Sequence, residues 1–214
     1  MKIKSFFLFT ILISVLTTNA QIRDSALAGE YYLEGVMEVG SGILLKSDHT
    51  FEMFFSYGSL DKSGTGTWTV KDCRVILNSG LRPANDFKLI SGKKSGAKGI
   101  TIKISDPNTN ILLYMACVIS EKGIADTSEA DENGVIHFDT SDADSIGLVH
   151  EMLSDRLCYF DISRSDDNYF EFGIEPWIMN IYCKNLVLTV HDSYLEGMHP
   201  LLEEGKMYTY RKSN

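Results

Sequence analysis

The stretch Phe51-Glu52-Met53-Phe54-Phe55-Ser56-Tyr57 has an alternating pattern that decides the fold. Its odd-numbered residues are all apolar or aromatic, and they fall on one face of an extended chain because strand side chains alternate between two faces. The same period of two occurs in Glu30-Tyr31-Tyr32-Leu33-Glu34 and in Gly66-Thr67-Trp68-Thr69-Val70. Turn-forming residues such as Ser47-Asp48-His49 separate these runs. The pattern predicts an antiparallel meander with strands near 30–37, 42–46, 50–57, 65–71, 74–78 and 86–90.

Short motifs along the same segment point to a known kind of sheet. They are Gly29-x-Tyr31-x-Leu33, Leu45-x-x-Asp48-His49-Thr50-Phe51, Gly64-Thr65-Gly66-Thr67-Trp68 and Val75-x-Leu77. Together they resemble the lipocalin-like meander of bacterial exported proteins. In that family the residue pair that begins with this Asp closes a hairpin, and Gly usually stands where this chain has His49. The strand that carries Gly-x-Trp fills the inside of the sheet. The resemblance implies a lipocalin-like antiparallel sheet over residues 28–90.

A stretch poor in apolar residues follows this sheet. Residues 91–99, Ser-Gly-Lys-Lys-Ser-Gly-Ala-Lys-Gly, contain no apolar side chain larger than Ala and three glycines. Little of such a segment can be buried, so we expect a solvated linker between two modules. A long hairpin tip inside one module is the alternative.

The second module, residues 100–214, is also expected to be β-structured. Ile100-Thr101-Ile102-Lys103-Ile104 alternates, residues 111–119 are nearly all apolar, and Glu132-Asn133-Gly134 is a turn. The next residues of note are Thr127, Asp131, Gly134 and Phe138. Together these features make residues 99–150 resemble the carboxypeptidase regulatory-like sandwich, in which an element with these four residue types is typical.

The resemblance implies an immunoglobulin-like β-sandwich, a structural or binding module with no catalytic residues. Further strands are expected near 157–163, 168–173, 179–190 and 206–211, as an extended tail packed on the sandwich. The predicted fold class is therefore all-β: an antiparallel lipocalin-like meander plus an immunoglobulin-like sandwich with extended C-terminal strands.

The N-terminus has the pattern of an export signal. Lys2 and Lys4 precede an apolar run from Phe6 to Leu16, and small residues lead to Ala20. We expect residues 1–20 to be cleaved as a signal peptide and Gln21 to begin the mature chain. Because no Cys follows the cleavage site, the mature protein is expected to be unlipidated, periplasmic or secreted, and without a transmembrane span.

The charge distribution narrows the function further. The formal net charge of −9 argues against nucleic acid as a partner, because phosphate binding requires a basic face. Residues 21–120 hold 11 basic and 10 acidic groups, whereas residues 121–214 hold 7 basic and 19 acidic groups. Such asymmetry is typical of two structural units or of one acidic face.

Few residues carry chemistry that the sequence can identify. The run Glu129-Ala-Asp131-Glu-Asn133-Gly resembles the start of a calcium loop, but the twelfth position is Thr140 rather than Glu, and a hairpin turn is the alternative. No nucleophile elbow, phosphate loop or metal-spaced histidine pair occurs, so neither catalytic residues nor a cofactor are predicted.

The cysteines leave two interpretations open. The four residues are Cys73, Cys117, Cys158 and Cys183, and an exported chain meets an oxidising compartment. Cys117 and Cys183 lie in apolar runs, and they either pair across a sandwich or act as small buried hydrophobic residues.

The aromatic residues provide the functional hypothesis. Tyr32 and Phe54 lie on strand faces opposite to Tyr31 and Phe55, so a sheet covered on one side leaves them as an apolar patch unless the other module covers them. With Tyr57 and Trp68 they are the candidate ligand-binding residues. The sequence predicts an exported, non-enzymatic binding or interaction protein whose partner is a small molecule, a glycan or an envelope protein. An envelope assembly subunit and a hydrolase with dispersed acidic residues are the alternatives.

Overall fold

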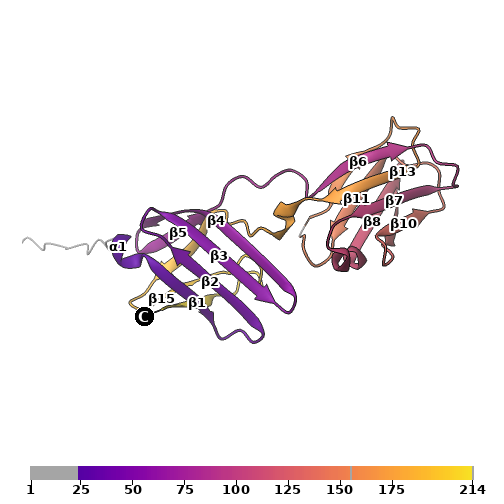
Figure 1. The fold of residues 1–214 in the computed structure, drawn as a ribbon. Coiled ribbons are helices and arrows are strands. Elements are labelled where there is room, and N and C mark those ends of the chain that lie inside the picture. The colour runs from indigo at the N-terminus through magenta and orange to yellow at the C-terminus, as the bar shows by residue number, and fades with distance from the viewer. Residues whose placement is uncertain (1–23, 155, 214) are drawn as a thin grey trace, which may run out of the picture.

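The computed structural model describes residues 24–154 and 156–213, so the predicted signal peptide over residues 1–20 lies outside the described chain. The described residues form an all-β protein with one closed barrel and two four-stranded sheets. Figure 1 shows the barrel and the pair of sheets side by side, joined by two connecting segments. No helix in the described ranges has the length and apolar character needed to span a lipid bilayer.

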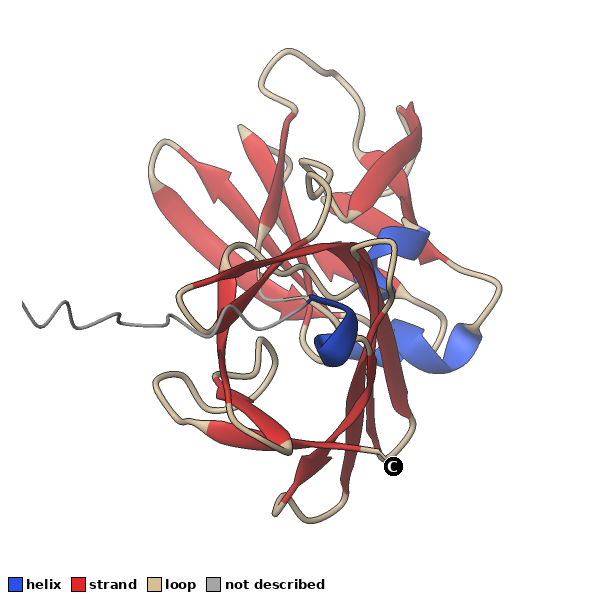
Figure 2. Cartoon of the chain, turned by 90° about the vertical axis from the view of Figure 1, so that its left-hand side faces the viewer, coloured by secondary structure: helices blue, strands red, loops and turns tan. Residues whose placement is uncertain are grey.

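The barrel is built from both ends of the chain. After the short helix α1 (Asp24–Leu27), its strands follow the order β1-β16-β15-β14-β5-β4-β3-β2, and each neighbouring pair is antiparallel. Figure 2 shows these strands surrounding the barrel interior. Their bounds are β1 Gly29–Glu34, β2 Val39–Leu45, β3 Thr50–Tyr57, β4 Leu60–Lys71, β5 Arg74–Asn78, β14 Leu186–Val190, β15 Tyr194–Gly197 and β16 Tyr208–Lys212.

The C-terminal strands differ from the sequence prediction. Residues 100–214 were expected to form one sandwich with a tail, but β14 pairs with β5 and β16 pairs with β1. The physical reason is that the N-terminal meander alone leaves two open edges, and its unpaired backbone groups are satisfied when β14–β16 close the sheet. The sixth predicted meander strand leaves the barrel and becomes β6 (Phe87–Lys93) of the sandwich.

The sandwich is inserted between β5 and β14. One sheet has the order β10-β7-β13-β6 and the other β12-β11-β8-β9, and β13 runs parallel to β7. The elements are β7 Ile100–Ser105, η1 Thr109–Tyr114, β8 Met115–Glu121, β9 Ile124–Glu129, β10 Val135–Phe138, β11 Ser145–His150, β12 Cys158–Asp161, β13 Tyr169–Ile174 and η2 Pro176–Met179.

The expected linker over residues 91–99 lies within this sandwich. Its first three residues belong to β6, and the rest lead to β7 of the same sheet. Asn168 holds the segment in place, because its side-chain amide donates to the carbonyl oxygens of Ala97 and Gly99 at 2.9 and 3.1 Å. The segment therefore lies inside one module rather than between two, but it is not the tip of a hairpin, because β13 lies between β6 and β7 in the sheet.

Side chains fill the barrel interior. Phe51, Met53 and Phe55 are buried there, as the alternation of β3 predicts. Trp68 is only 1% exposed, and its indole N–H donates to the carbonyl oxygen of Lys46 at 2.9 Å. His49 stands where Gly is usual and adopts the left-handed φ of 64°, and its ring packs against Trp68 with the ring planes tilted by 39°.

Two buried tyrosines of the barrel differ in how their hydroxyl groups are satisfied. The Tyr31 hydroxyl donates to the carbonyl oxygen of Leu27 at 2.8 Å, and so fastens α1 to the barrel. The Tyr210 side chain is fully buried, and its hydroxyl has no hydrogen-bond partner within the described residues. A buried hydroxyl without a partner destabilises the folded state, whereas a bonded one is close to neutral or stabilising.

A buried carboxylate organises the junction between barrel and sandwich. Asp86 is fully buried, and it accepts hydrogen bonds from the guanidinium of Arg82 (3.0 Å), from the Nε of Arg156 (3.0 Å) and from the hydroxyl of Ser154 (2.8 Å). Burial raises the pKa of Asp86, but the bonds from Arg156 and Ser154, together with the positive charges of Arg82 and Arg156, outweigh it and hold that pKa below its usual range. The carboxylate thus ties the first connecting segment to the β11–β12 loop.

A buried lysine joins the two units at a second point. The Lys62 ammonium donates to the carbonyl oxygens of Leu153 and Ile178 at 2.5 and 2.8 Å. Because Lys62 lies on β4 and both acceptors belong to the sandwich side, the barrel and the sandwich share polar contacts at their junction.

Removing the unpartnered hydroxyl should stabilise the protein. We expect Tyr210→Phe to raise the free energy of unfolding by about 1 kcal/mol, and Tyr31→Phe to lower it by about 1 kcal/mol because a made hydrogen bond is lost. Urea unfolding followed by circular dichroism measures both. Equal effects of the two substitutions would contradict the assignment.

Neutralising the junction carboxylate should be costly. We expect Asp86→Asn to lower the free energy of unfolding by about 3 kcal/mol, because it leaves two guanidinium groups around a buried amide. The matched control is Asp139→Asn, since the Asp139 side chain is fully exposed. Thermal and urea melts of the two variants are compared, and a loss at Asp86 no larger than at Asp139 would show that the network is not structural.

Candidate functional site

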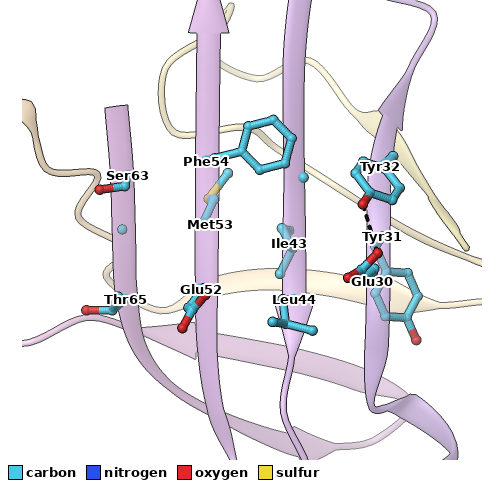
Figure 3. A pocket seen from close by; sticks show the side chains of 12 residues that line it. Glu30, Tyr31, Tyr32, Ile43, Leu44, Glu52, Met53, Phe54, Ser63 and Thr65 are labelled. Atoms are coloured by element: carbon cyan, nitrogen blue, oxygen red, sulfur yellow. Dashed lines mark hydrogen bonds between the residues drawn. The ribbon is translucent and has the colours of Figure 1, made fainter. Parts of the chain in front are cut away.

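A groove runs across the outer wall of the barrel over β1–β4. We call it the outer groove, and its volume is about 450 Å³. The strand register places its outward side chains in two adjacent rows, shown in Figure 3. The rows are Tyr32–Gly42–Phe54–Ser63 and Glu30–Leu44–Glu52–Thr65.

The glycine of the first row lets two aromatic rings pack over the backbone of β2. Tyr32 and Phe54 lie on either side of Gly42, with ring centroids 6.3 Å apart and ring planes at 62°. A Cβ at Gly42 would stand 2.6 Å from the Phe54 ring and 3.1 Å from the Tyr32 ring. Both rings remain 42–43% exposed, so this wall presents two aromatic side chains to solvent.

Polar groups line the second row. The Tyr32 hydroxyl donates to a Glu30 carboxylate oxygen at 2.8 Å, and Lys46 forms an ion pair with Glu52. The bond to Glu30 raises the pKa of Tyr32, so its phenol stays protonated at neutral pH. The groove therefore combines apolar ring faces with carboxylate and hydroxyl oxygens, a combination that fits a ligand with both apolar and hydroxylated surfaces.

A second depression adjoins the outer groove on the far side of β4. We call it the side hollow; its volume is about 380 Å³, and Ser63, Gly64 and Thr65 border both depressions. Its other wall comes from the two connecting segments and includes Trp177 and Tyr182. The two depressions thus meet along one strand.

The structure brings together two of the four predicted ligand-binding residues. Tyr32 and Phe54 share the outer groove, as the alternation of their strands implies. Tyr57 and Trp68 lie apart from it: Tyr57 is 50% exposed and lines a cleft between the barrel and the sandwich, whereas Trp68 is enclosed in the core, where a ligand has no access. The difference follows from strand parity, because Tyr57 and Trp68 lie on the inner face of the barrel.

The sequence analysis missed the remaining residues of the groove. Gly42, Glu30, Glu52, Ser63 and Thr65 were not among the candidate ligand-binding residues. A signal existed, since each of these residues has the parity of an outward position on its own strand. Only the register between strands, however, shows that they form rows.

Asp131, one of the candidate calcium ligands, forms hydrogen bonds within its own turn. One oxygen of Asp131 accepts hydrogen bonds from the backbone N–H groups of Asn133 and Val135 at 2.9 and 2.8 Å. These bonds, that to Val135 most of all, hold the pKa of Asp131 below its usual value. Glu129 ends β9, and across the described ranges no three or more His, Cys, Asp or Glu residues gather in a metal-binding arrangement. The geometry thus favours the hairpin-turn alternative.

A serine and a histidine meet inside the barrel mouth. The Nε2 atom of His199 lies 3.1 Å from the Ser41 hydroxyl, which itself donates to the carbonyl oxygen of Phe54 at 2.7 Å. His199 Nδ1 accepts from the backbone N–H of Leu201 at 3.0 Å. The Ser41 proton is therefore directed at a carbonyl rather than at the imidazole, which is the opposite of an activated serine nucleophile. The pair acts as a structural contact.

The four cysteines are unpaired. Cys117 belongs to the core of the sandwich and Cys183 to the core of the barrel, so these two do not pair across one sandwich. Burial raises the pKa of Cys117 to about 12 and that of Cys183 to about 11, which keeps both thiols protonated at neutral pH. Both therefore behave as small buried hydrophobic residues.

His199 should make the stability of the barrel depend on pH. Burial lowers its pKa from 6.5 to about 4. Above pH 6.5 the imidazole is neutral in both states, whereas between pH 6.5 and 4 the unfolded chain binds a proton that the folded chain excludes. We therefore expect this group to remove about 3 kcal/mol of stability by pH 4.

The measurement is urea unfolding of wild type and His199→Gln across that pH range. The free energy of unfolding of wild type should fall relative to that of His199→Gln as the pH falls. The control His137→Gln, at an exposed histidine, should follow the wild-type curve. Parallel curves for wild type and His199→Gln would contradict the prediction.

Comparison with known proteins leaves the chain without an assigned family. No protein-family model matches it, and no curated protein matches it. The resemblances of residues 28–90 and 99–150 to known domains therefore stay predictions.

Proposed function

We propose that this protein is an exported, non-enzymatic binding protein that holds a small molecule or glycan in the outer groove. The observation that carries the proposal is the pair of exposed rings, Tyr32 and Phe54, on either side of Gly42. Aromatic side chains on a surface contribute binding energy through burial of their faces when a ligand covers them.

The strands that carry these two rings also support a role in binding. Tyr32 lies on β1 and Phe54 on β3, and each strand is paired on both sides within a closed barrel. Neither ring contributes to the buried core of the barrel. Rigid strands fix the two rings before a ligand arrives, so little conformational entropy is lost on binding.

Export rests on the signal-like N-terminus over residues 1–20, with Gln21 as the expected first residue of the mature chain. The lipocalin-like motifs of residues 28–90 belong to the same proposal, because they resemble those of exported bacterial proteins. Together these features support a periplasmic or secreted location.

The experiment is native mass spectrometry of the exported protein purified from the envelope fraction of an expressing bacterium. We expect a non-covalent small-molecule adduct on wild type that is lost in the double variant Tyr32→Ser/Phe54→Ser. The matched control is Tyr159→Ser, because Tyr159 is 59% exposed on the sandwich, away from the groove. Thermal melts should confirm that all variants fold.

Each other outcome has a clear meaning. An adduct retained by the double variant would place the ligand elsewhere and overturn the proposal. A stoichiometric protein in place of a small molecule would favour an assembly subunit. Turnover of an offered glycan or peptide would favour the hydrolase alternative.

A further inference from the structure

The geometry points to an extended, uncharged oligosaccharide as the ligand, lying across β4 so that it occupies the outer groove and the side hollow together. This inference rests on the proposed function and adds the ligand class and its path. It is carried by three features: the continuity of the two depressions, the aromatic residues at both ends, and the oxygen-rich strand between them.

Continuity comes from the outward residues of β4. Ser63 and Thr65 are exposed, and they border the outer groove on one side and the side hollow on the other. Both side chains are small, so the strand forms a low ridge rather than a wall. Adjacent strands are spaced by about 4.8 Å, so a path from β1 to beyond β4 covers roughly 15 to 20 Å, which is longer than a single sugar ring.

Aromatic side chains stand at both ends of this path. Tyr32 and Phe54 lie at one end, and Trp177 and Tyr182 lie at the other. The second pair is held in place: the Trp177 N–H donates to the carbonyl oxygen of Asn85 at 2.8 Å, and the Arg82 guanidinium stacks over Tyr182 at 5.5 Å. Sugar rings have apolar C–H faces that stack on aromatic rings, so spaced aromatic residues fit successive rings of one chain.

The polar groups along the path fit sugar hydroxyls. Glu30 and Glu52 offer carboxylate acceptors, and Ser63 and Thr65 offer hydroxyl groups. A lipid chain would instead require a continuous apolar surface, which this row of oxygen atoms interrupts. The two carboxylates also disfavour an acidic glycan through charge repulsion, so an uncharged one fits better.

A peptide is the less suitable occupant for a backbone reason. Peptides that bind to sheets usually add a strand to an open edge. Here β1 to β3 are paired on both sides, and β4 is bordered by β3, by β5 and by the segment whose Ile181 N–H donates to the Ser63 carbonyl at 2.7 Å. This wall has no strand edge to extend, so recognition depends on side chains and on hydroxyl chemistry.

The test is isothermal titration of the folded chain with neutral cello-, chito- and malto-oligosaccharides, from monosaccharide to hexasaccharide. In at least one series we expect the affinity to rise about tenfold from disaccharide to hexasaccharide, as the ligand reaches the side hollow. Thr65→Arg should remove that gain, so that this variant binds the hexasaccharide no more tightly than it binds the disaccharide. Ser63→Arg is a second variant at the same ridge.

The matched control is Thr69→Arg. Thr69 is exposed on the outer face of the same strand but borders neither depression, so this variant should keep the length dependence. Phe54→Ser should weaken binding at every length. Thermal melts of each variant verify folding.

Two results would overturn the inference while leaving the proposed function in place. One is binding that depends on Phe54 but not on chain length; the other is binding of no oligosaccharide alongside a small-molecule adduct that depends on Tyr32 and Phe54. Loss of length dependence in Thr69→Arg as well would also overturn it. Absence of any ligand that depends on Tyr32 and Phe54 would remove both proposals.

Discussion

Closure of the barrel by strands from opposite ends of the chain is the constraint on which the structure depends. β1 meets β16, with Tyr31 opposite Lys212, and β5 meets β14, with Leu77 opposite Leu186. Bringing such distant residues together carries a loop-closure cost, which a folded insert reduces because it holds its own ends near each other. Here the two connecting segments, by which the chain leaves the barrel and re-enters it, are hydrogen-bonded to each other. The Ser79 N–H donates to the Cys183 carbonyl at 2.8 Å, and the Glu175 N–H donates to the Asp86 carbonyl at 2.9 Å. The sandwich thus holds the two connecting segments close to each other, and the hydrogen bonds of the buried Asp86 stabilise this arrangement.

The local features of the fold could be predicted from the sequence, because they depend on neighbouring residues. Period-two alternation placed the strand over Thr50–Tyr57, and the all-β class with an antiparallel meander and a sandwich is confirmed, whereas closure of the meander into a barrel was not predicted. The strand at 124–129 was missed since its residues are almost all exposed and give no alternation. The pairing of β1 with β16 could not be predicted for a different reason. The residues Tyr208–Lys212 predict a strand, but they do not indicate that this strand pairs with one near the other end of the chain.

Charge illustrates the same limit. Along the chain the acidic residues concentrate after residue 120, which favoured a near-neutral first module and a strongly acidic second one. Counted by structural unit, residues 24–79 and 186–213 of the barrel side hold 7 basic and 12 acidic groups, and residues 80–185 hold 10 basic and 17 acidic groups. Both units are therefore acidic. The asymmetry arose because the C-terminal barrel strands were counted with the sandwich, so a charge argument drawn from chain order fails when a domain is inserted.

Barrel closure also links the candidate site to the far end of the chain. Tyr32 faces Gly42 on one side and Arg211 of β16 on the other, so the position of its ring depends on a strand that the chain completes last. Without β16, β1 would be an edge strand with unpaired backbone groups, and the register that aligns Tyr32, Gly42 and Phe54 would be less constrained. The outer groove is thus assembled from N-terminal residues but positioned by C-terminal ones. This dependence explains why the sequence could nominate Tyr32 and Phe54 by strand parity, yet only the closed barrel turns them into one preorganised surface.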